Sequence, residues 1–200
     1  MPRILVAVII SLMSMTAMAK SIVVLGDSIS AGYGIEVAQG WVAVLQKKLD
    51  EQRAIHILHN ESISGDTTAG GLARIDRALT AHKPDVVIIE LGANDGLRGL
   101  PPALIKSNLA EIVHRAQAVG AKILLLSMKI PPNYGQRYIT TFSTIYVQLA
   151  KELGVTYVPF IMEDVALTKG MMQQDGLHPN AKGQLVIADK VWLQLLPLLK

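Results

Sequence analysis

One histidine of this chain lies in a sequence setting that suits a general base. His178 occurs in Asp175-Gly176-Leu177-His178-Pro179, three residues after an aspartate and in a predicted loop. A carboxylate at that spacing can accept a hydrogen bond from the ring Nδ1–H, which leaves Nε2 free to take a proton. The same spacing also suits an ordinary loop hydrogen bond. The remaining histidines are interpreted as surface or packing residues: His56, His59, His82 and His114.

A serine follows the first predicted strand. Ser28 comes after the apolar run 21–25 and the pair Gly26-Asp27, so we expect it where a buried strand meets a loop. Glycine permits a tight backbone path there, and the serine can then face a crevice at the sheet edge. A helix cap and a phosphate-binding helix N-terminus are the alternatives. The glycine patterns of nucleotide-binding loops are absent, which argues against a nucleotide-binding fold. The G-x-S-x-G nucleophile elbow of the large α/β-hydrolases is absent too.

Acyl transfer also needs donors for the negatively charged oxygen of its tetrahedral intermediate. Gly65, after the second predicted strand, can present a backbone N–H, and Asn94, after the third, can present a side-chain amide. Either residue alone could equally be an ordinary turn residue. Together with Ser28 and His178, they supply the groups that a serine hydrolase requires.

The elements that must position these residues alternate along the chain. Short apolar runs predict strands at 21–25, 55–58, 86–91, 123–126 and 155–158. Apolar residues at helical spacing predict helices over 41–51, 71–81, 102–119 and 142–153, and a last one capped by Asn180. Strands that are apolar on both faces and alternate with amphipathic helices are typical of a covered parallel sheet. We expect one three-layer α/β/α domain, doubly wound and flavodoxin-like, with about five strands.

The predicted fold brings the candidate residues to one place. In doubly wound folds, ligands bind beyond the carboxyl ends of the strands. Ser28, Gly65 and Asn94 follow the first three predicted strands, and the Asp175–His178 segment follows the fifth. We therefore expect a site at this edge of the sheet.

Four blocks of the sequence resemble, in order, the sequence blocks of the SGNH (GDSL) hydrolase family. The resemblance extends over essentially the whole chain after residue 19. Within the family, segment 130–138 resembles the multifunctional bacterial periplasmic branch, which acts as acyl-CoA thioesterase, arylesterase and lysophospholipase. Ile29 replaces the leucine that the family usually has, and keeps the position apolar. The blocks are Gly26-Asp27-Ser28-Ile29-Ser30, Gly65-Asp66 within 62–67, Gly92-Ala93-Asn94-Asp95 and Asp175-Gly176-Leu177-His178-Pro179.

The resemblance implies that Ser28 is the nucleophile, His178 the base and Asp175 the residue that orients it. It implies an oxyanion hole made of the Ser28 and Gly65 backbone N–H groups and the Asn94 side chain. Such an enzyme cleaves fatty acyl esters and thioesters through an acyl-Ser28 intermediate, without a metal ion or cofactor. The alternatives are a carbohydrate O-deacetylase on the same fold and a non-catalytic periplasmic binding domain.

Substrate contacts are expected from loops at the same edge of the sheet, because loops carry most of the variation in function. Plain loop packing is the alternative interpretation of these residues. The expected contacts are Asp27, Leu97, Leu100, Pro131 and Tyr134.

Composition restricts the class of protein. A chain of 200 residues that is 50% hydrophobic and 18% charged fits one globular domain and argues against disorder. The absence of cysteine excludes disulfides and thiolate catalysis. The net charge of +3 is not concentrated in a basic stripe, so we expect no nucleic-acid partner. No second histidine stands at ligand spacing from His178, which argues against a zinc site.

The first nineteen residues resemble a secretory signal peptide. Arg3 precedes the apolar run 4–13, and Ala17-Met18-Ala19 provides small residues for cleavage. A buried N-terminal helix is the alternative. We expect residues 1–19 to be removed and residues 20–200 to form the hydrolase domain in the bacterial periplasm or outside the cell. That domain is expected to be a monomer without a stable membrane anchor.

Overall fold

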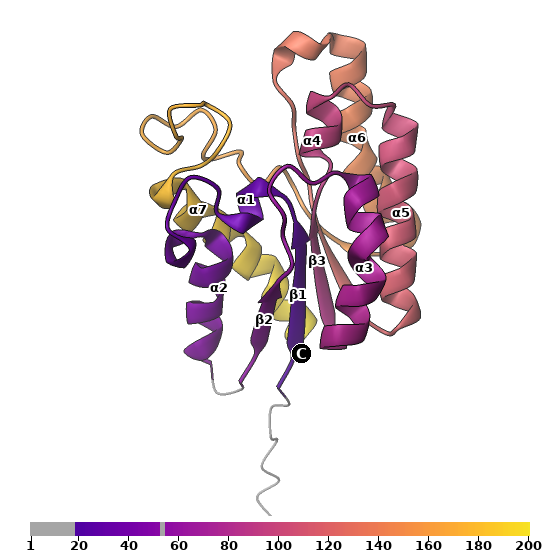
Figure 1. Cartoon of the computed structure of the whole chain (residues 1–200), viewed down its shortest axis with the longest axis vertical. Coiled ribbons are helices and arrows are strands. Elements are labelled where there is room, and N and C mark those ends of the chain that lie inside the picture. Colours follow the sequence, from indigo (N-terminus) through magenta and orange to yellow (C-terminus); the bar gives the residue numbers. More distant parts are fainter. Residues whose placement is uncertain (1–18, 53–54) are drawn as a thin grey trace, which may run out of the picture.

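A five-stranded parallel sheet forms the centre of the protein (Figure 1). The computed structural model describes residues 19–52 and 55–200, so the expected signal peptide falls outside the described residues except for its last position. The strand order is β2-β1-β3-β4-β5, which is the flavodoxin-like order and confirms the expected fold. The strands are β1 (Ser21–Gly26), β2 (Ile57–Asn60), β3 (Val86–Glu90), β4 (Lys122–Leu126) and β5 (Thr156–Val158).

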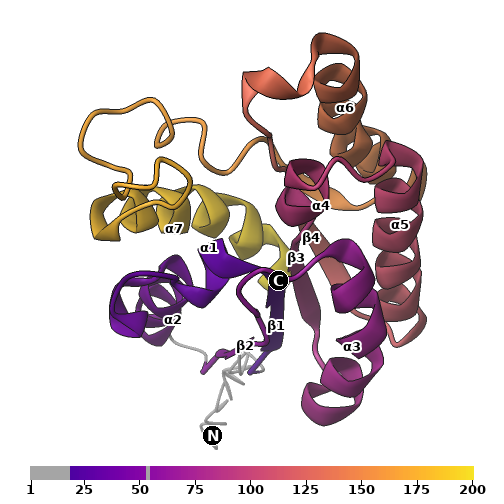
Figure 2. The ribbon, with the colours of Figure 1, turned by 45° about the horizontal axis from the view of Figure 1, so that its top comes forward.

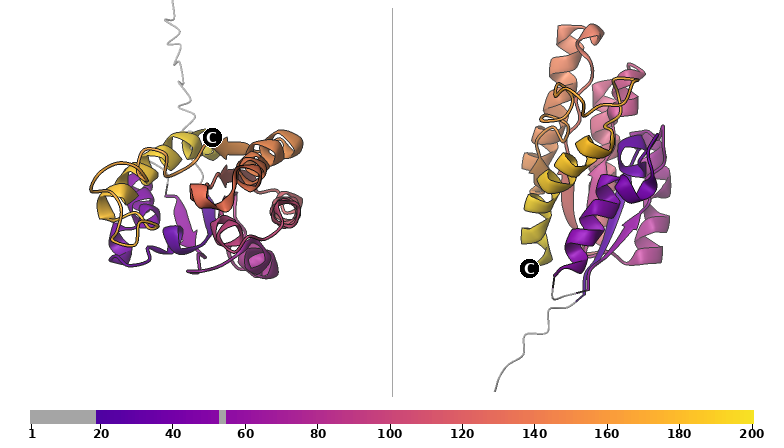
Figure 3. Two further views of the ribbon diagram at one scale, coloured as in Figure 1. Left: turned by 90° about the horizontal axis from the view of Figure 1, so that it is seen from above. Right: turned by 90° about the vertical axis from the view of Figure 1, so that its left-hand side faces the viewer.

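Helices cover both faces of this sheet (Figure 3). The first face carries α2 (Trp41–Asp50) and α7 (Ala181–Leu195), which pack against each other. The second carries α3 (Thr68–His82), α5 (Pro102–Ala118) and α6 (Gln136–Leu153), packed side by side. Because both faces are covered, the side chains of β3 are all buried. Shorter elements are α1 (Ser28–Ala31), α4 (Ala93–Leu97) and 3-10 turns at Val37–Gln39, Pro132–Tyr134 and Leu196–Leu199.

Several helix ends follow from their sequence. The Asn180 side chain accepts hydrogen bonds from the N–H groups of Lys182 and Gly183, so the predicted cap of α7 is confirmed. Thr67 caps α3 in the same way. Gly154 ends α6 with a φ of 63°, a left-handed conformation that glycine adopts without strain.

The second strand differs from its predicted range. The apolar run predicts 55–58, whereas β2 spans Ile57–Asn60 and pairs with β1 from Ser21↔Ile57 to Val24↔Asn60. Ile55 is exposed instead. The reason is that β2 lies at the edge of the sheet, where side chains are only partly covered and the strand does not need to be apolar. The Leu58 N–H of β2 donates to the Gln46 side-chain oxygen of α2 rather than to another strand.

The chain reverses its direction of travel across the sheet after β2, so β1 and β3 are neighbours whose carboxyl ends open into a crevice. Between β5 and α7, residues 159–180 form turns and bends with an isolated bridge between Met172 and Pro179. Figure 2 shows this segment as a long loop above α7. Among the described residues, no helix has the length and apolar character needed to cross a bilayer.

Candidate active site

Ser28, His178 and Asp175 form a continuous hydrogen-bonded series. Ser28 is the first residue of α1, and its hydroxyl lies 2.8 Å from His178 Nε2. On the other side of the ring, His178 Nδ1 lies 2.6 Å from Asp175 Oδ2. With the proton on Nδ1, the ring donates to Asp175 and accepts from Ser28. Nε2 is then placed to remove the Ser28 proton.

The turn that carries His178 is organised by Asp175 itself. Its Oδ1 accepts hydrogen bonds from the N–H groups of Leu177 and His178, at 2.9 and 3.0 Å. Partial burial raises the pKa of Asp175, but the hydrogen bonds from the His178 ring and from these N–H groups outweigh burial and lower it to about 2. The carboxylate is therefore ionised at neutral pH. The Tyr33 ring packs on His178 at a centroid distance of 4.7 Å and limits its rotation.

The cap of α1 is Asp27 rather than Ser28, so the alternative of Ser28 as a helix cap is wrong. Asp27 Oδ1 accepts from the Ile29 N–H at 3.1 Å. This arrangement leaves the Ser28 hydroxyl free for His178. In the part of the chain that the structure describes, the backbone N–H of Ser28 has no acceptor. It is therefore available to a bound oxyanion.

The two other expected donors follow β2 and β3. Gly65, in the loop after β2, has a φ of 80° and lies in open space, and its N–H likewise meets no acceptor among the described residues. Asn94 is the second residue of α4, and its amide nitrogen donates to Asp27 Oδ2 (3.1 Å) and to the Asp66 carbonyl (2.8 Å). Both N–H bonds of this amide are thus engaged. An oxyanion bound by Asn94 would have to replace one of these acceptors or share an N–H group with it.

A second carboxyl group lies directly beneath Asp27. Glu90, at the end of β3, is fully buried and its Oε2 accepts from Ser30 Oγ at 2.6 Å and from the Asp27 N–H at 3.3 Å. Its Oε1 has no partner within the described chain. Burial, reinforced by the nearby Asp27, raises the pKa of Glu90 well above its usual value. Burial also raises the pKa of Asp27 to about 6, against opposing contributions from the Ile29 N–H and His178. Burial therefore favours the protonated forms of both carboxyl groups.

We expect Glu90→Gln to stabilise the protein more at pH 8 than at pH 5. A carboxyl whose pKa is raised on folding favours the folded state while protonated, and this advantage disappears as pH rises above its unfolded pKa and through its folded pKa. Glutamine keeps the shape of protonated Glu90 and does not titrate. Folding of the variant therefore requires no proton uptake above the unfolded pKa of Glu90. The gain in unfolding free energy from Glu90→Gln should therefore increase from pH 5 to pH 8.

Thermal unfolding of both proteins at pH 5, 6, 7 and 8 tests this expectation. Glu152→Gln is the matched control, because Glu152 is exposed and pairs with Lys106 on the surface. A difference between Glu90→Gln and wild type that stays constant from pH 5 to pH 8 would show that the buried pair does not titrate in this window.

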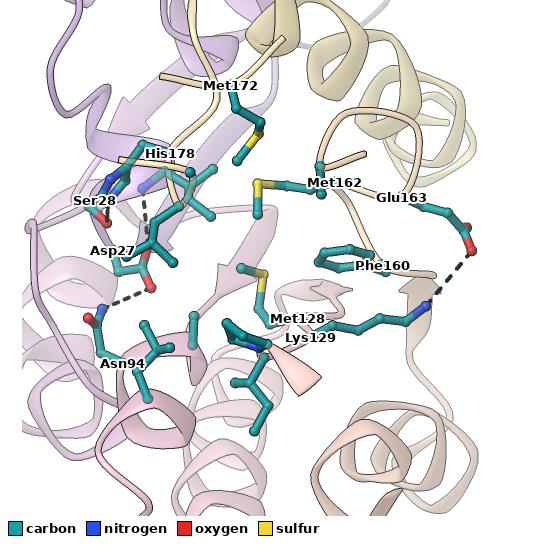
Figure 4. Close-up of a pocket in the computed structure, with 18 of the residues that line it drawn as sticks. Asp27, Ser28, Asn94, Met128, Lys129, Phe160, Met162, Glu163, Met172 and His178 are labelled. Carbon is teal, nitrogen blue, oxygen red and sulfur yellow. Dashed lines mark hydrogen bonds and ion pairs between the residues drawn. The ribbon is translucent and has the colours of Figure 1, made fainter. Parts of the chain in front are cut away.

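A largely apolar pocket of about 620 Å³ opens beside Ser28 and His178. This volume is typical of small-molecule sites. Figure 4 shows Ser28, His178, Asp27 and Asn94 on one side of it and the Lys129–Glu163 ion pair (3.9 Å) on the other. Most of the other lining residues are apolar, and three of them are methionines. The apolar lining residues are Ile29, Ala93, Leu97, Met128, Ile130, Pro131, Pro132, Phe160, Met162, Ala166, Leu167, Met172 and Leu177.

The expected substrate contacts divide into two groups. Asp27, Leu97 and Pro131 line the pocket, whereas Leu100 and Tyr134 do not. Tyr134 donates through its hydroxyl to the Leu97 carbonyl at 2.8 Å, so it braces the wall from behind. The Leu100 carbonyl accepts from another tyrosine hydroxyl in the same layer. Both residues pack against the core and support the residues that face the pocket.

Sequence reasoning missed one wall of the pocket. Phe160, Met162, Leu167 and Met172 all come from the 159–180 segment. A signal was present, because these residues follow the fifth strand at the correct sheet edge. They have neither helical nor strand spacing, however, so the pattern of apolar residues predicts no element that would place them at the pocket.

A comparison with protein families agrees with this geometry. The sequence profile of the GDSL-like lipase/acylhydrolase family matches residues 24–186, which include Ser28, Gly65, Asn94, Asp175 and His178. The chain belongs to this family.

Individual relatives are similar over nearly their full length. Esterase TesA of Pseudomonas aeruginosa is 49% identical over 188 residues, which cover 94% of each chain. Thioesterase 1/protease 1/lysophospholipase L1 of Escherichia coli K12 is 44% identical over 182 residues, covering 91% of this chain and 86% of the relative. Among solved structures, the psychrotrophic esterase EstA from Pseudoalteromonas sp., inhibited by monoethylphosphonate, has a TM-score of 0.85. It is 41% identical and covers 89% of this chain and 97% of its own.

Proposed function

We propose that this chain is a serine hydrolase that cleaves esters and thioesters of fatty acyl groups, with Ser28 as nucleophile, His178 as general base and Asp175 as the residue that orients it. The observation that carries this proposal is the hydrogen bond between Ser28 Oγ and His178 Nε2 at the mouth of an apolar pocket. The names of the relatives, an esterase and a thioesterase/lysophospholipase, support the same reaction class.

The reaction proceeds in two halves. Ser28 Oγ attacks the acyl carbon while His178 Nε2 takes its proton, and the resulting oxyanion accepts hydrogen bonds from the N–H groups of Ser28 and Gly65 and from Asn94. The intermediate collapses, and His178 gives the proton to the departing alcohol or thiol. Water then attacks acyl-Ser28 with His178 again as base, and the carboxylic acid leaves. Asp175 stays ionised and stabilises the imidazolium form throughout.

The pocket favours an acyl chain over an acetyl group. Its walls between Met128, Met162 and Met172 can bury many methylene groups, each worth about 0.8 kcal/mol. Methionine side chains are flexible and polarisable, so they adapt to chains of different length and shape. An O-deacetylase would not need this volume beside the nucleophile.

Hydrolysis of p-nitrophenyl esters from acetate to palmitate by residues 20–200 tests the proposal. We expect Ser28-dependent activity with the highest kcat/KM at medium or long chains, because the apolar pocket contributes binding in the transition state. Activity limited to acetate would favour the deacetylase, and no activity on any ester or acyl thioester would favour a binding domain.

We also propose that the mature enzyme begins at Lys20 and works as a monomer in the periplasm. The order of Arg3, the apolar run 4–13 and Ala17-Met18-Ala19 supports cleavage after residue 19. N-terminal sequencing of the protein from a periplasmic fraction, followed by gel filtration, examines both points.

A further inference from the structure

Arg74 binds three separate segments at the edge of the sheet that carries the site. It projects from the middle of α3, and its side chain is only 13% exposed. Nε donates to Asp66 Oδ2 at 2.8 Å, Nη1 donates to the Glu61 carbonyl, and Nη2 donates to the Gly26 carbonyl at 3.2 Å. Each nitrogen of the guanidinium group therefore contacts a different part of the chain.

These three segments lie next to the proposed oxyanion donors. Gly26 immediately precedes the Asp27–Ser28 peptide that supplies the Ser28 N–H. Asp66 follows Gly65, and its carbonyl accepts from the Asn94 amide at 2.8 Å. Arg74 is thus one residue or one hydrogen bond away from all three donors, although it touches none of them.

The Gly65 segment is held by polar contacts. From Glu61 to Thr67 no residue is buried, and Ile63 is 51% exposed. Its start is fixed by the Glu61 N–H, which donates to the Val24 carbonyl, and by the Glu61 carboxylate, which lies 2.7 Å from His82 Nε2. Closer to Gly65, the Ile63 N–H donates to the Gly26 carbonyl, the Asp66 carbonyl accepts from Asn94, and Arg98 donates to the Gly65 carbonyl. A loop without apolar anchors depends on such hydrogen bonds for its geometry.

We propose that Arg74 is a positioning residue for the oxyanion hole, which holds the Gly65 N–H and the Ser28 N–H at a fixed separation. This inference rests on the proposed function, because it assigns those N–H groups to the oxyanion. An arginine suits this task better than a lysine, since its planar group presents several donors in fixed directions and an ammonium group does not.

Kinetics of Arg74→Met and Arg74→Lys on p-nitrophenyl butyrate test the proposal. Displacing oxyanion donors lowers transition-state stabilisation, so kcat of Arg74→Met should fall by about 10–100-fold while KM changes by less than about threefold. Arg74→Lys should fold and show a smaller loss of kcat. Arg115→Met is the matched control, because Arg115 lies on α5 and pairs with Asp76 and Glu111 at the surface.

A second readout separates positioning from general structural damage. An alkyl trifluoromethyl ketone forms a tetrahedral adduct with an oxyanion, and its Ki should weaken by the same factor as kcat/KM, whereas binding of the fatty acid product should not change. The inference would be overturned if Arg74→Met weakened the binding of the ketone and of the fatty acid equally. It would also be overturned if Arg74→Met were folded and fully active and Arg74→Lys had wild-type kcat. If Arg74→Met does not fold, wild-type kcat in Arg74→Lys alone overturns it. Each of these results overturns only the role of Arg74, provided that the wild type is an active, Ser28-dependent esterase. An inactive wild type would instead overturn the proposed function and this inference with it.

Discussion

Ser28→Ala should reduce ester hydrolysis by at least about 10⁴-fold while the protein stays folded. Among the described residues the hydroxyl makes a single hydrogen bond to another side chain, the one to His178, and Ser28 is not the cap of α1. Its removal therefore deletes the proposed nucleophile without disturbing the backbone. Circular dichroism and thermal unfolding should match wild type, and kcat/KM on p-nitrophenyl butyrate measures the loss.

A phosphonate ester gives an independent measurement of the same residue. Wild type should take up one phosphonyl group per chain, detected by intact mass, and Ser28→Ala none. Ser107→Ala is the control, because Ser107 is an exposed serine on α5. Labelling of Ser28→Ala, or activity within tenfold of wild type, would remove Ser28 from the proposed role.

Asp175→Asn should lower kcat by about 10³–10⁴-fold. Asparagine can still accept the N–H groups of Leu177 and His178, so the turn should persist. Its NH₂ group, however, would face Nδ1 and favour the tautomer that carries its proton on Nε2. His178 could then no longer accept the proton of Ser28.

Asp189→Asn is a matched control for this substitution, since Asp189 lies on α7 and pairs with Lys48 at the surface. The pH profile adds a second criterion. Because the pKa of Asp175 is lowered to about 2, this carboxyl stays ionised at every pH from 5 upward. The acid limb of the wild-type profile should therefore not arise from Asp175. An Asp175→Asn variant with kcat within tenfold of wild type would contradict the orienting role.

The sheet and its long helices were predictable because their signals are local. β1, β3 and β4 are short apolar runs, and α5 and α7 carry clear caps or apolar stripes. The exception is β2, whose polar residues His59 and Asn60 belong to an edge strand and not to an apolar run. The helices α1 and α4 are only four and five residues long, too short for a periodic pattern to appear.

The site was predictable in part for the same reason. Asp175 and His178 lie three residues apart, so their hydrogen bond follows from a local turn. The meeting of Ser28 with His178 depends on the whole fold and was inferred from topology and from family resemblance. The pocket wall was not predictable from spacing, because Leu100 and Tyr134 face the core and the 159–180 segment supplies the wall in their place.

The 159–180 segment carries both a pocket wall and, at its far end, His178, the proposed general base. Phe160, Met162 and Met172 contact the space for the acyl group, and His178 follows within the same run of turns. The wall and the imidazole therefore share one stretch of backbone. We expect a change in this stretch that moves the wall to be felt at His178 as well, so that an altered preference for acyl length would be accompanied by an altered rate.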